Sequence, residues 1–203
     1  MLSKKFFILN VSNIINLLSL FLLQYLISKY LSEKSFSEFT AILGLCFMLL
    51  PLINFGISPY IIKNYFKKSE YKDDTLRNIF NYLNFTSIFI ILIFFLFSRY
   101  ILNIDSPILI IVFGIHLISN VFFEILYSKF QYKYNYFKIL FLIICFNFSK
   151  LFLIITFLYL RGSIDLNLVA YIYLISSIIV IILYYFNFRD IINKIKIFEF
   201  KTF

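Results

Sequence analysis

Six long apolar stretches constrain the fold of this chain more than any other feature of its sequence. They cover residues 6–28, 39–66, 78–102, 107–127, 137–160 and 166–188. A bilayer core about 30 Å thick is crossed by about 20 apolar residues in a helix. The stretches lack the apolar/polar alternation of membrane β-barrels. The sequence therefore predicts an all-α polytopic membrane protein, a bundle of about six transmembrane helices that forms one membrane domain over residues 1–203.

The composition excludes soluble domains and argues against an enzyme. Hydrophobic residues make up 62% of the chain, while charged residues make up 14%, about half the usual share of a soluble domain. There is one His, and Gly is rare, with no paired metal-ligand motif and no Gly-rich phosphate loop. We therefore expect no metal site, no cofactor and no enzymatic activity.

Basic residues gather on one side of the predicted bundle. Lys and Arg in short loops are retained on the cytoplasmic side of a membrane. One side comprises the N-terminus, the loops after the second and fourth stretches and the segment after the sixth. Its basic residues are Lys4, Lys5, Lys63, Lys67, Lys68, Lys72, Arg77, Lys129, Lys133, Lys138, Arg189, Lys194, Lys196 and Lys201. The opposite side has four basic residues. Both termini are therefore predicted to be cytoplasmic. The net charge of +9 is explained by this topology, so we expect no nucleic-acid partner.

Two segments depart from a plain membrane helix. The second stretch is longer than a bilayer needs and contains Pro51, Gly56 and Pro59, which predict a kink or an extension beyond the hydrocarbon. Residues 189–203 form a basic amphipathic tail. This tail fits either a segment that lies along the inner leaflet or the start of a continuation of the chain.

Polar residues inside the fourth and fifth stretches are the candidate functional residues, because charges in hydrocarbon usually face the protein interior or a water-filled cavity. His116, Asn120 and Glu124 recur every four residues and share one helix face. Asn147 and Lys150 lie three residues apart on one face of the next helix. Counted from the cytoplasmic ends, His116 and Lys150 both lie about 18 Å deep. The spacing predicts a facing polar ladder between these two helices.

This ladder has two interpretations. Lys150 and His116, with Asn120 and Asn147, line a substrate pathway and attract an anionic group, or His116 and Glu124 relay protons. Alternatively, the polar groups form a hydrogen-bond network that only fixes helix packing. Glu124 lies roughly 12 Å nearer the cytoplasm than Lys150, so we expect a separate partner for it, or contact with water.

The first stretch has a polar face of its own. Ser12, Asn16 and Ser19 lie within about 60° of arc on a helix, with Asn13 nearby. Polar side chains commonly bond between membrane helices, so we interpret this face as a packing surface.

Three short segments resemble a known transporter family. They are LSEKSFSEF (Leu31–Phe39), INFGISPYIIK (Ile53–Lys63) and KFQYKYNYFK (Lys129–Lys138). They resemble the N-terminal half of the polysaccharide flippases, the Wzx-like O-antigen and exopolysaccharide transporters of the multidrug/oligosaccharidyl-lipid/polysaccharide exporter superfamily. The matching positions are Phe55, Gly56, Ile57, Lys63, Phe130 and Gln131, whereas Ser37 stands where the family usually has Gly.

The resemblance implies a function and an assembly. Such a protein moves an undecaprenyl-pyrophosphate-linked oligosaccharide across the bacterial cytoplasmic membrane by alternating access between two lobes. The resemblance implies that Lys150, helped by His116, supplies the buried positive charge for the pyrophosphate. The family has two bundles of six or more helices, so we expect this chain to be a fragment of a longer protein, to pair with a second six-helix lobe, or to form a homodimer.

A non-transporting membrane scaffold remains open, and so do two further functions. One is a drug exporter of the same superfamily, which the low Gly content and the lack of an acidic pair in the first stretch disfavour. The other is a membrane-embedded glycan enzyme, an O-antigen polymerase or an acyltransferase. Such enzymes need a large outer loop with convergent Arg, His or Asp, and the predicted outer loops here are short.

Overall fold

The chain is a bundle of apolar helices. The structure, a computed structural model, describes residues 2–54, 86, 88–102, 104 and 106–192. No β-strand occurs in these ranges, so the predicted all-α class is confirmed. Five of the described helices are long and apolar enough to cross a membrane: Phe7–Tyr30, Glu33–Ile53, Pro107–Gln131, Tyr136–Arg161 and Leu166–Arg189. The chain is therefore a polytopic helical membrane protein, with a shorter apolar helix at Ile88–Ile101.

The helices extend somewhat beyond the apolar stretches. Their bounds are Leu2–Tyr30 for α1, Glu33–Asn54 for α2, Pro107–Tyr132 for α5 and Leu166–Ile192 for α8. The helix Ile88–Ile101 ends in a π-helical turn, η2 (Phe97–Ile101). The fifth stretch is one continuous helix made of α6 (Tyr136–Ile143), the π-helical turn η3 (Ile144–Phe148) and α7 (Ser149–Arg161).

Some predictions fall on residues that the structure does not describe. Residues 55–66 of the second stretch, including Gly56, Pro59 and Lys63, are among them, as are residues 78–85 of the third. Pro51 lies inside α2, close to its end. Of the predicted tail, residues 189–192 continue α8, and residues 193–203 lie outside the described part.

Local sequence signals set the helix ends. Ser106 is the N-cap of α5, with Pro107 in the first turn, and its side chain accepts a hydrogen bond from Leu109 N. Asn135 and Asp165 cap α6 and α8 in the same way. Gly162 ends α7 in the left-handed conformation, with φ 72°, which is the usual role of Gly after a helix.

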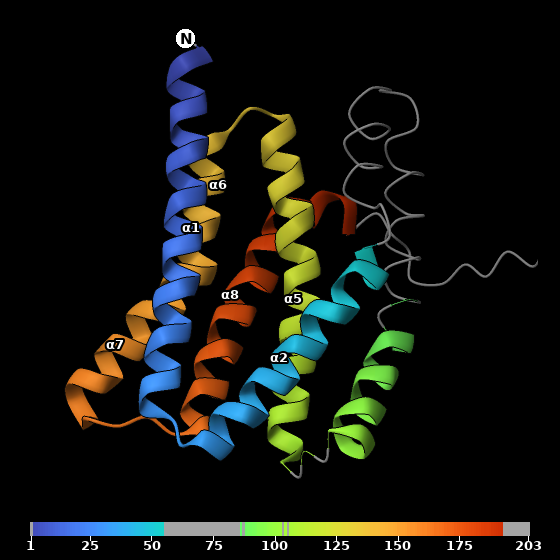
Figure 1. The fold of residues 1–203 in the computed structure, drawn as a ribbon. Helices are drawn as coiled ribbons and strands as arrows, with labels where there is room; N and C mark the ends of the chain where they lie inside the picture. Colours follow the sequence, from blue (N-terminus) through green and yellow to red (C-terminus); the bar gives the residue numbers. More distant parts are fainter. Residues whose placement is uncertain (1, 55–85, 87, 103, 105, 193–203) are drawn as a thin grey trace, which may run out of the picture.

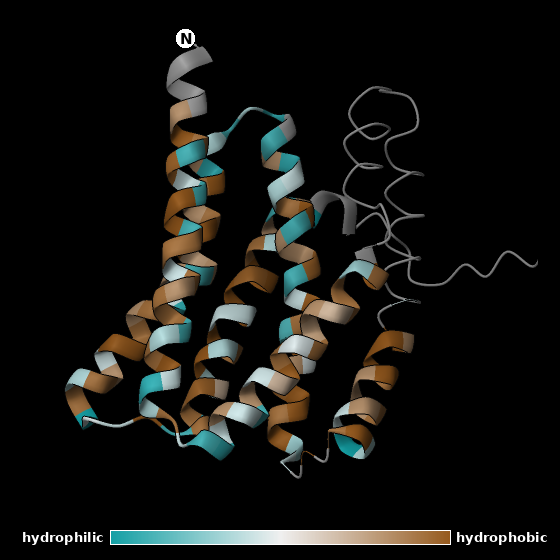
Figure 2. Cartoon of the chain, viewed as in Figure 1, coloured by the Kyte–Doolittle hydropathy of each residue, from teal (hydrophilic) through white to brown (hydrophobic). Residues whose placement is uncertain are grey.

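α5 lies at the centre of the bundle (Figure 1). It packs most extensively against α8 and also against α2, while α1 packs against α6, η3 and α7. Buried small residues on α5 and α8 permit this close approach; they include Ser119 on α5 and Ala170, Ser176 and Ser177 on α8. Figure 2 shows apolar residues along the helices and hydrophilic residues in the loops that join them.

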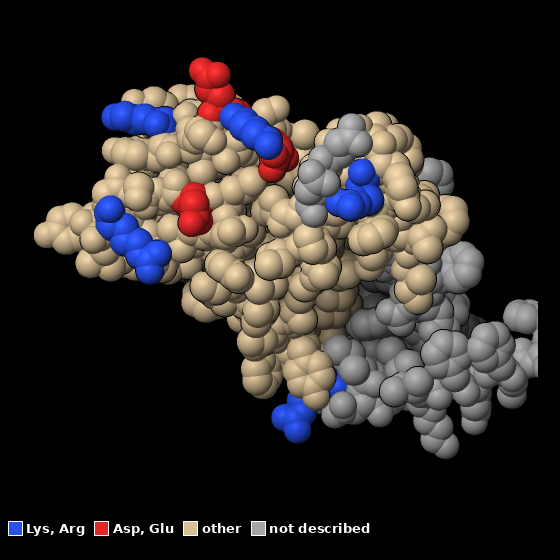
Figure 3. Space-filling view, turned by 90° about the horizontal axis from the view of Figure 1, so that it is seen from below, with Lys and Arg blue, Asp and Glu red and all other residues tan. Residues whose placement is uncertain are grey.

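The two ends of the bundle differ in charge. Described residues at the end with the α5–α6 turn include Lys129, Lys133, Lys138 and Arg189. Figure 3 views the opposite end, where basic and acidic residues mix. That end includes Lys29, Glu33, Lys34, Glu38, Arg161 and Asp165. Placing the first end in the cytoplasm is a prediction from the basic residues.

Candidate functional site

Lys150 is enclosed in the middle of the bundle. It lies in the first turn of α7, and only 2% of its surface is exposed. Its ammonium group donates a hydrogen bond to Asn147 Oδ1 at 3.2 Å. It also lies 3.9 Å from the centre of the Phe146 ring and 4.7 Å from that of Tyr173. Among the described residues no carboxylate contacts it, so its neighbours are one amide and two aromatic rings.

These neighbours offset part of the cost of burying a charge. An ammonium group in membrane hydrocarbon costs at least a few kcal/mol. A desolvated cation over an aromatic ring gains about 2 kcal/mol, and a hydrogen bond to a charged group gains about 1.5–3 kcal/mol. The ammonium retains donors that these contacts do not use. The site therefore holds one buried lysine that no described acidic group contacts.

The π-helical turn η3 places two of these neighbours. Phe146 and Asn147 lie in η3 and are buried, and Lys150 follows one residue after α7 begins. A π-helical turn adds a residue to one turn, which shifts the helix faces before and after it. Figure 1 shows that α6 runs beside α1 and that α7 leans outward below η3. Such turns occur often at functional sites.

His116 of α5 shares both aromatic rings with Lys150. Its imidazole stacks on Phe146, with ring centres 5.4 Å apart, and meets Tyr173 edge-on at 4.8 Å. Its Nδ1 lies 3.0 Å from Ser177 Oγ of α8. His116 is 3% exposed. The structure thus brings the two predicted cationic residues to one cluster, with Phe146 and Tyr173 between them.

Asn147 connects this cluster to α1. Its Nδ2 donates to Asn16 Oδ1 at 2.6 Å, while its Oδ1 accepts from Lys150. The polar face of α1 therefore includes a direct partner of the site. Ser12 and Ser19 bond back to carbonyls of their own helix, at Ile8 and Ile15.

The predicted ladder forms only in part. Asn120 Nδ2 donates to His116 O at 2.8 Å, within α5, so Asn120 bonds its own helix rather than Asn147. Asn147 bonds Asn16 of α1 instead. Glu124 is half-buried on α5, and the predicted separate partner for it stays a prediction.

Three residues of the cluster were not predicted. Tyr173 and Ser177 of α8 and Phe146 of η3 surround Lys150 and His116. Aromatic residues are too common in this chain, at 22%, for any one of them to stand out. The one sequence signal that pointed to this part of α8 was the pair Ser176–Ser177, two polar residues inside an apolar stretch. Both side chains bond back to Tyr173 O, and Ser177 Oγ also reaches His116.

No group of three His, Cys, Asp or Glu side chains lies together in the described ranges. Both cysteines are free, and Cys46 is buried, with Sγ 3.6 Å from Phe113 O. Comparisons with protein-family models, with curated proteins and with solved structures give no match. What stands established is a multi-pass α-helical membrane protein with an enclosed Lys–His cluster at its centre.

Proposed function

We propose that this chain is one lobe of a transporter that moves a lipid-linked oligosaccharide across the bacterial cytoplasmic membrane by alternating access. The observation that carries the proposal is the buried ammonium group of Lys150, which no described carboxylate contacts. A pyrophosphate that links lipid to sugar is a multiply charged anion that such a cation attracts. The resemblance of three sequence segments to polysaccharide flippases supports the same substrate.

Substrate reaches Lys150 only if the bundle opens, because the side chain is enclosed. α1 is the element best suited to move. Among the described residues, the hydrogen bond between Asn16 and Asn147 connects α1 to this cluster. Many large apolar side chains of α1 are exposed, among them Phe7, Leu17 and Phe21. In this proposal, opening between α1 and η3 exposes Lys150 to the substrate. A second set of helices, from the same chain continued, from another polypeptide or from a second copy, completes the pathway.

A complementation experiment tests the proposal. The chain is expressed in a flippase-deficient strain, together with any adjoining reading frame that encodes a further set of helices, and the surface glycan is measured. Lys150→Met removes the charge at a similar volume but leaves Asn147 Oδ1 without its donor, so Lys150→Gln, which keeps a donor, is tested beside it. We expect Lys150→Met and Lys150→Gln to lose most glycan export at normal membrane levels.

Lys133→Gln is the matched control, because Lys133 is an exposed lysine on the α5–α6 turn. It is expected to export normally. Full glycan restoration by both Lys150 variants would leave Lys150 with a packing role and remove the basis of the proposal. Failure of the unaltered chain to restore glycan with any partner helices would count against the function itself.

A further inference from the structure

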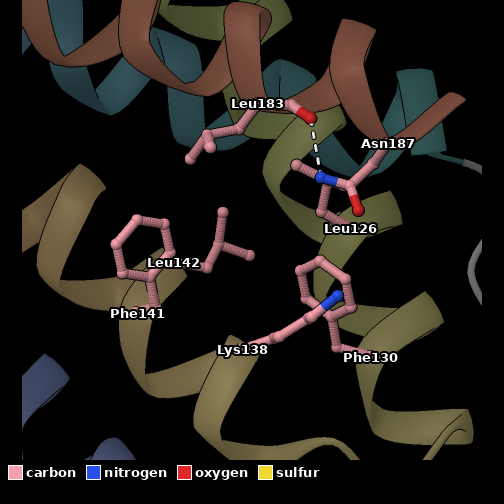
Figure 4. A pocket seen from close by; sticks show the side chains of 7 residues that line it. All are labelled: Leu126, Phe130, Lys138, Phe141, Leu142, Leu183 and Asn187. Atoms are coloured by element: carbon pink, nitrogen blue, oxygen red, sulfur yellow. Dashed lines mark hydrogen bonds between the residues drawn. The ribbon is translucent and has the colours of Figure 1, made fainter. Parts of the chain in front are cut away.

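A cavity lies away from the Lys150 cluster, between α5, α6 and α8. Its volume is about 140 Å³, and it is partly open to the outside. Its walls are mostly apolar and include Leu126 of α5, Phe141 and Leu142 of α6 and Leu183 of α8. Figure 4 shows that Lys138 and Asn187 are the polar side chains among the residues around it.

Lys138 places a positive charge at this cavity. It lies in the first turn of α6 and is exposed, and its ammonium is 5.6 Å from the centre of the Phe130 ring. No acidic side chain among the described residues contacts it. By contrast, nearby Lys129 has partners within the protein. Its ammonium donates a hydrogen bond to Asn187 O at 2.6 Å and lies 4.0 Å from the centre of the Phe188 ring.

We propose that this cavity binds an anionic glycerophospholipid, with the phosphate at Lys138 and the start of one acyl chain among the apolar residues. A cavity with one lysine at its edge and leucine and phenylalanine within matches a ligand that is charged at one end and apolar beyond it. Basic pockets between membrane helices are known to take lipid headgroups. A lysine near a helix end extends its ammonium toward the headgroup level. The inference stands apart from the transport proposal, because it uses neither Lys150 nor His116.

The absence of Trp from the chain permits a direct test. Phe141→Trp places a single fluorescent reporter at the cavity wall in the full chain, reconstituted in phosphatidylcholine vesicles. Brominated phosphatidylglycerol and brominated phosphatidylcholine are then compared as quenchers. We expect the anionic lipid to occupy the site about five-fold more strongly, as attraction to one lysine near the surface predicts.

Control variants distinguish specific lipid binding at the cavity from a general attraction of anionic lipid to the basic surface. Phe152→Trp reports from an exposed position on α7, away from the cavity, and should show no lipid preference. Lys138→Gln should abolish the preference at Phe141→Trp, Lys138→Arg should keep it, and Lys133→Gln should leave most of it. Leu183→Phe, which narrows the cavity, should weaken quenching by the anionic lipid.

Three results would overturn the proposal. One is equal quenching by the two lipids at Phe141→Trp. Another is a loss of the preference for anionic lipid that is as large with Lys133→Gln as with Lys138→Gln, which would show that the preference comes from the basic surface in general. The third is displacement of the brominated anionic lipid by millimolar inorganic phosphate, which would make the site one for free anions.

Discussion

The ammonium nitrogen of Lys150 lies 3.9 Å from the centre of the Phe146 ring, four residues earlier on the same helix. The same ring stacks against His116 of α5, so one aromatic side chain contacts both Lys150 and His116. If this contact stabilises the ammonium, Phe146 and Lys150 are energetically coupled.

Phe146→Leu should destabilise the protein much less when Lys150 is already Met. A double-mutant cycle of these two substitutions, measured by unfolding in mixed micelles, should give a coupling energy of about 1–2 kcal/mol. Additive effects of the two substitutions would show that the ring only fills space.

The Asn16–Asn147 bond gives a second prediction. Asn16→Ala should destabilise the protein by about 0.6–1.7 kcal/mol, from the average to the maximum measured for hydrogen bonds between membrane helices, because it breaks the hydrogen bond between α1 and η3. Asn13→Ala is the control, since Asn13 makes a longer, exposed bond to Tyr127 at 3.4 Å. Equal destabilisation by both variants would contradict a specific role for the Asn16–Asn147 bond.

Two adjacent serines allow a matched test of the His116 contact. Ser177→Ala removes the hydroxyl 3.0 Å from His116 Nδ1 and leaves a buried ring nitrogen without this partner. We expect a loss of about 1–3 kcal/mol in the free energy of unfolding. Ser176→Ala removes a hydroxyl that bonds only its own helix, at Tyr173 O, and should change stability by less than about 0.5 kcal/mol. A larger loss of stability with Ser176→Ala than with Ser177→Ala would contradict a stabilising role for the contact between His116 and Ser177.

The predicted orientation is tested by cysteine labelling of intact cells. Both native cysteines are first replaced, as Cys46→Ala and Cys145→Ala. A membrane-impermeant maleimide should then label Ser163→Cys, in the exposed turn after α7, and should not label Lys133→Cys, on the α5–α6 turn, until the cells are opened. The reverse pattern would place the termini outside and overturn the topology drawn from the basic residues.

The sequence predicted the helices and the enclosed residues Lys150 and His116, but not most of the partners of these two residues. Lengths of apolar stretches predict membrane helices because hydrocarbon forces each backbone amide to bond within its own segment. A charge in such a stretch predicts burial for the same reason, and Lys150 and His116 are indeed enclosed. Equal depth and a shared face could not distinguish Asn120 from Asn16 as the partner of Asn147. That choice depends on how α1 packs against η3.

Apolar length, scarce charge and isolated polar residues are properties of each segment alone, so the class of this protein follows from its sequence. Packing between helices was needed to show that Lys150 meets Tyr173 of α8, that Asn147 bonds Asn16 of α1, and that Lys138 lies at a cavity. The physical reason is that a π-helical turn shifts a helix face, and that packing between helices sets which side chains face one another. Neither effect is encoded in the hydropathy of one segment.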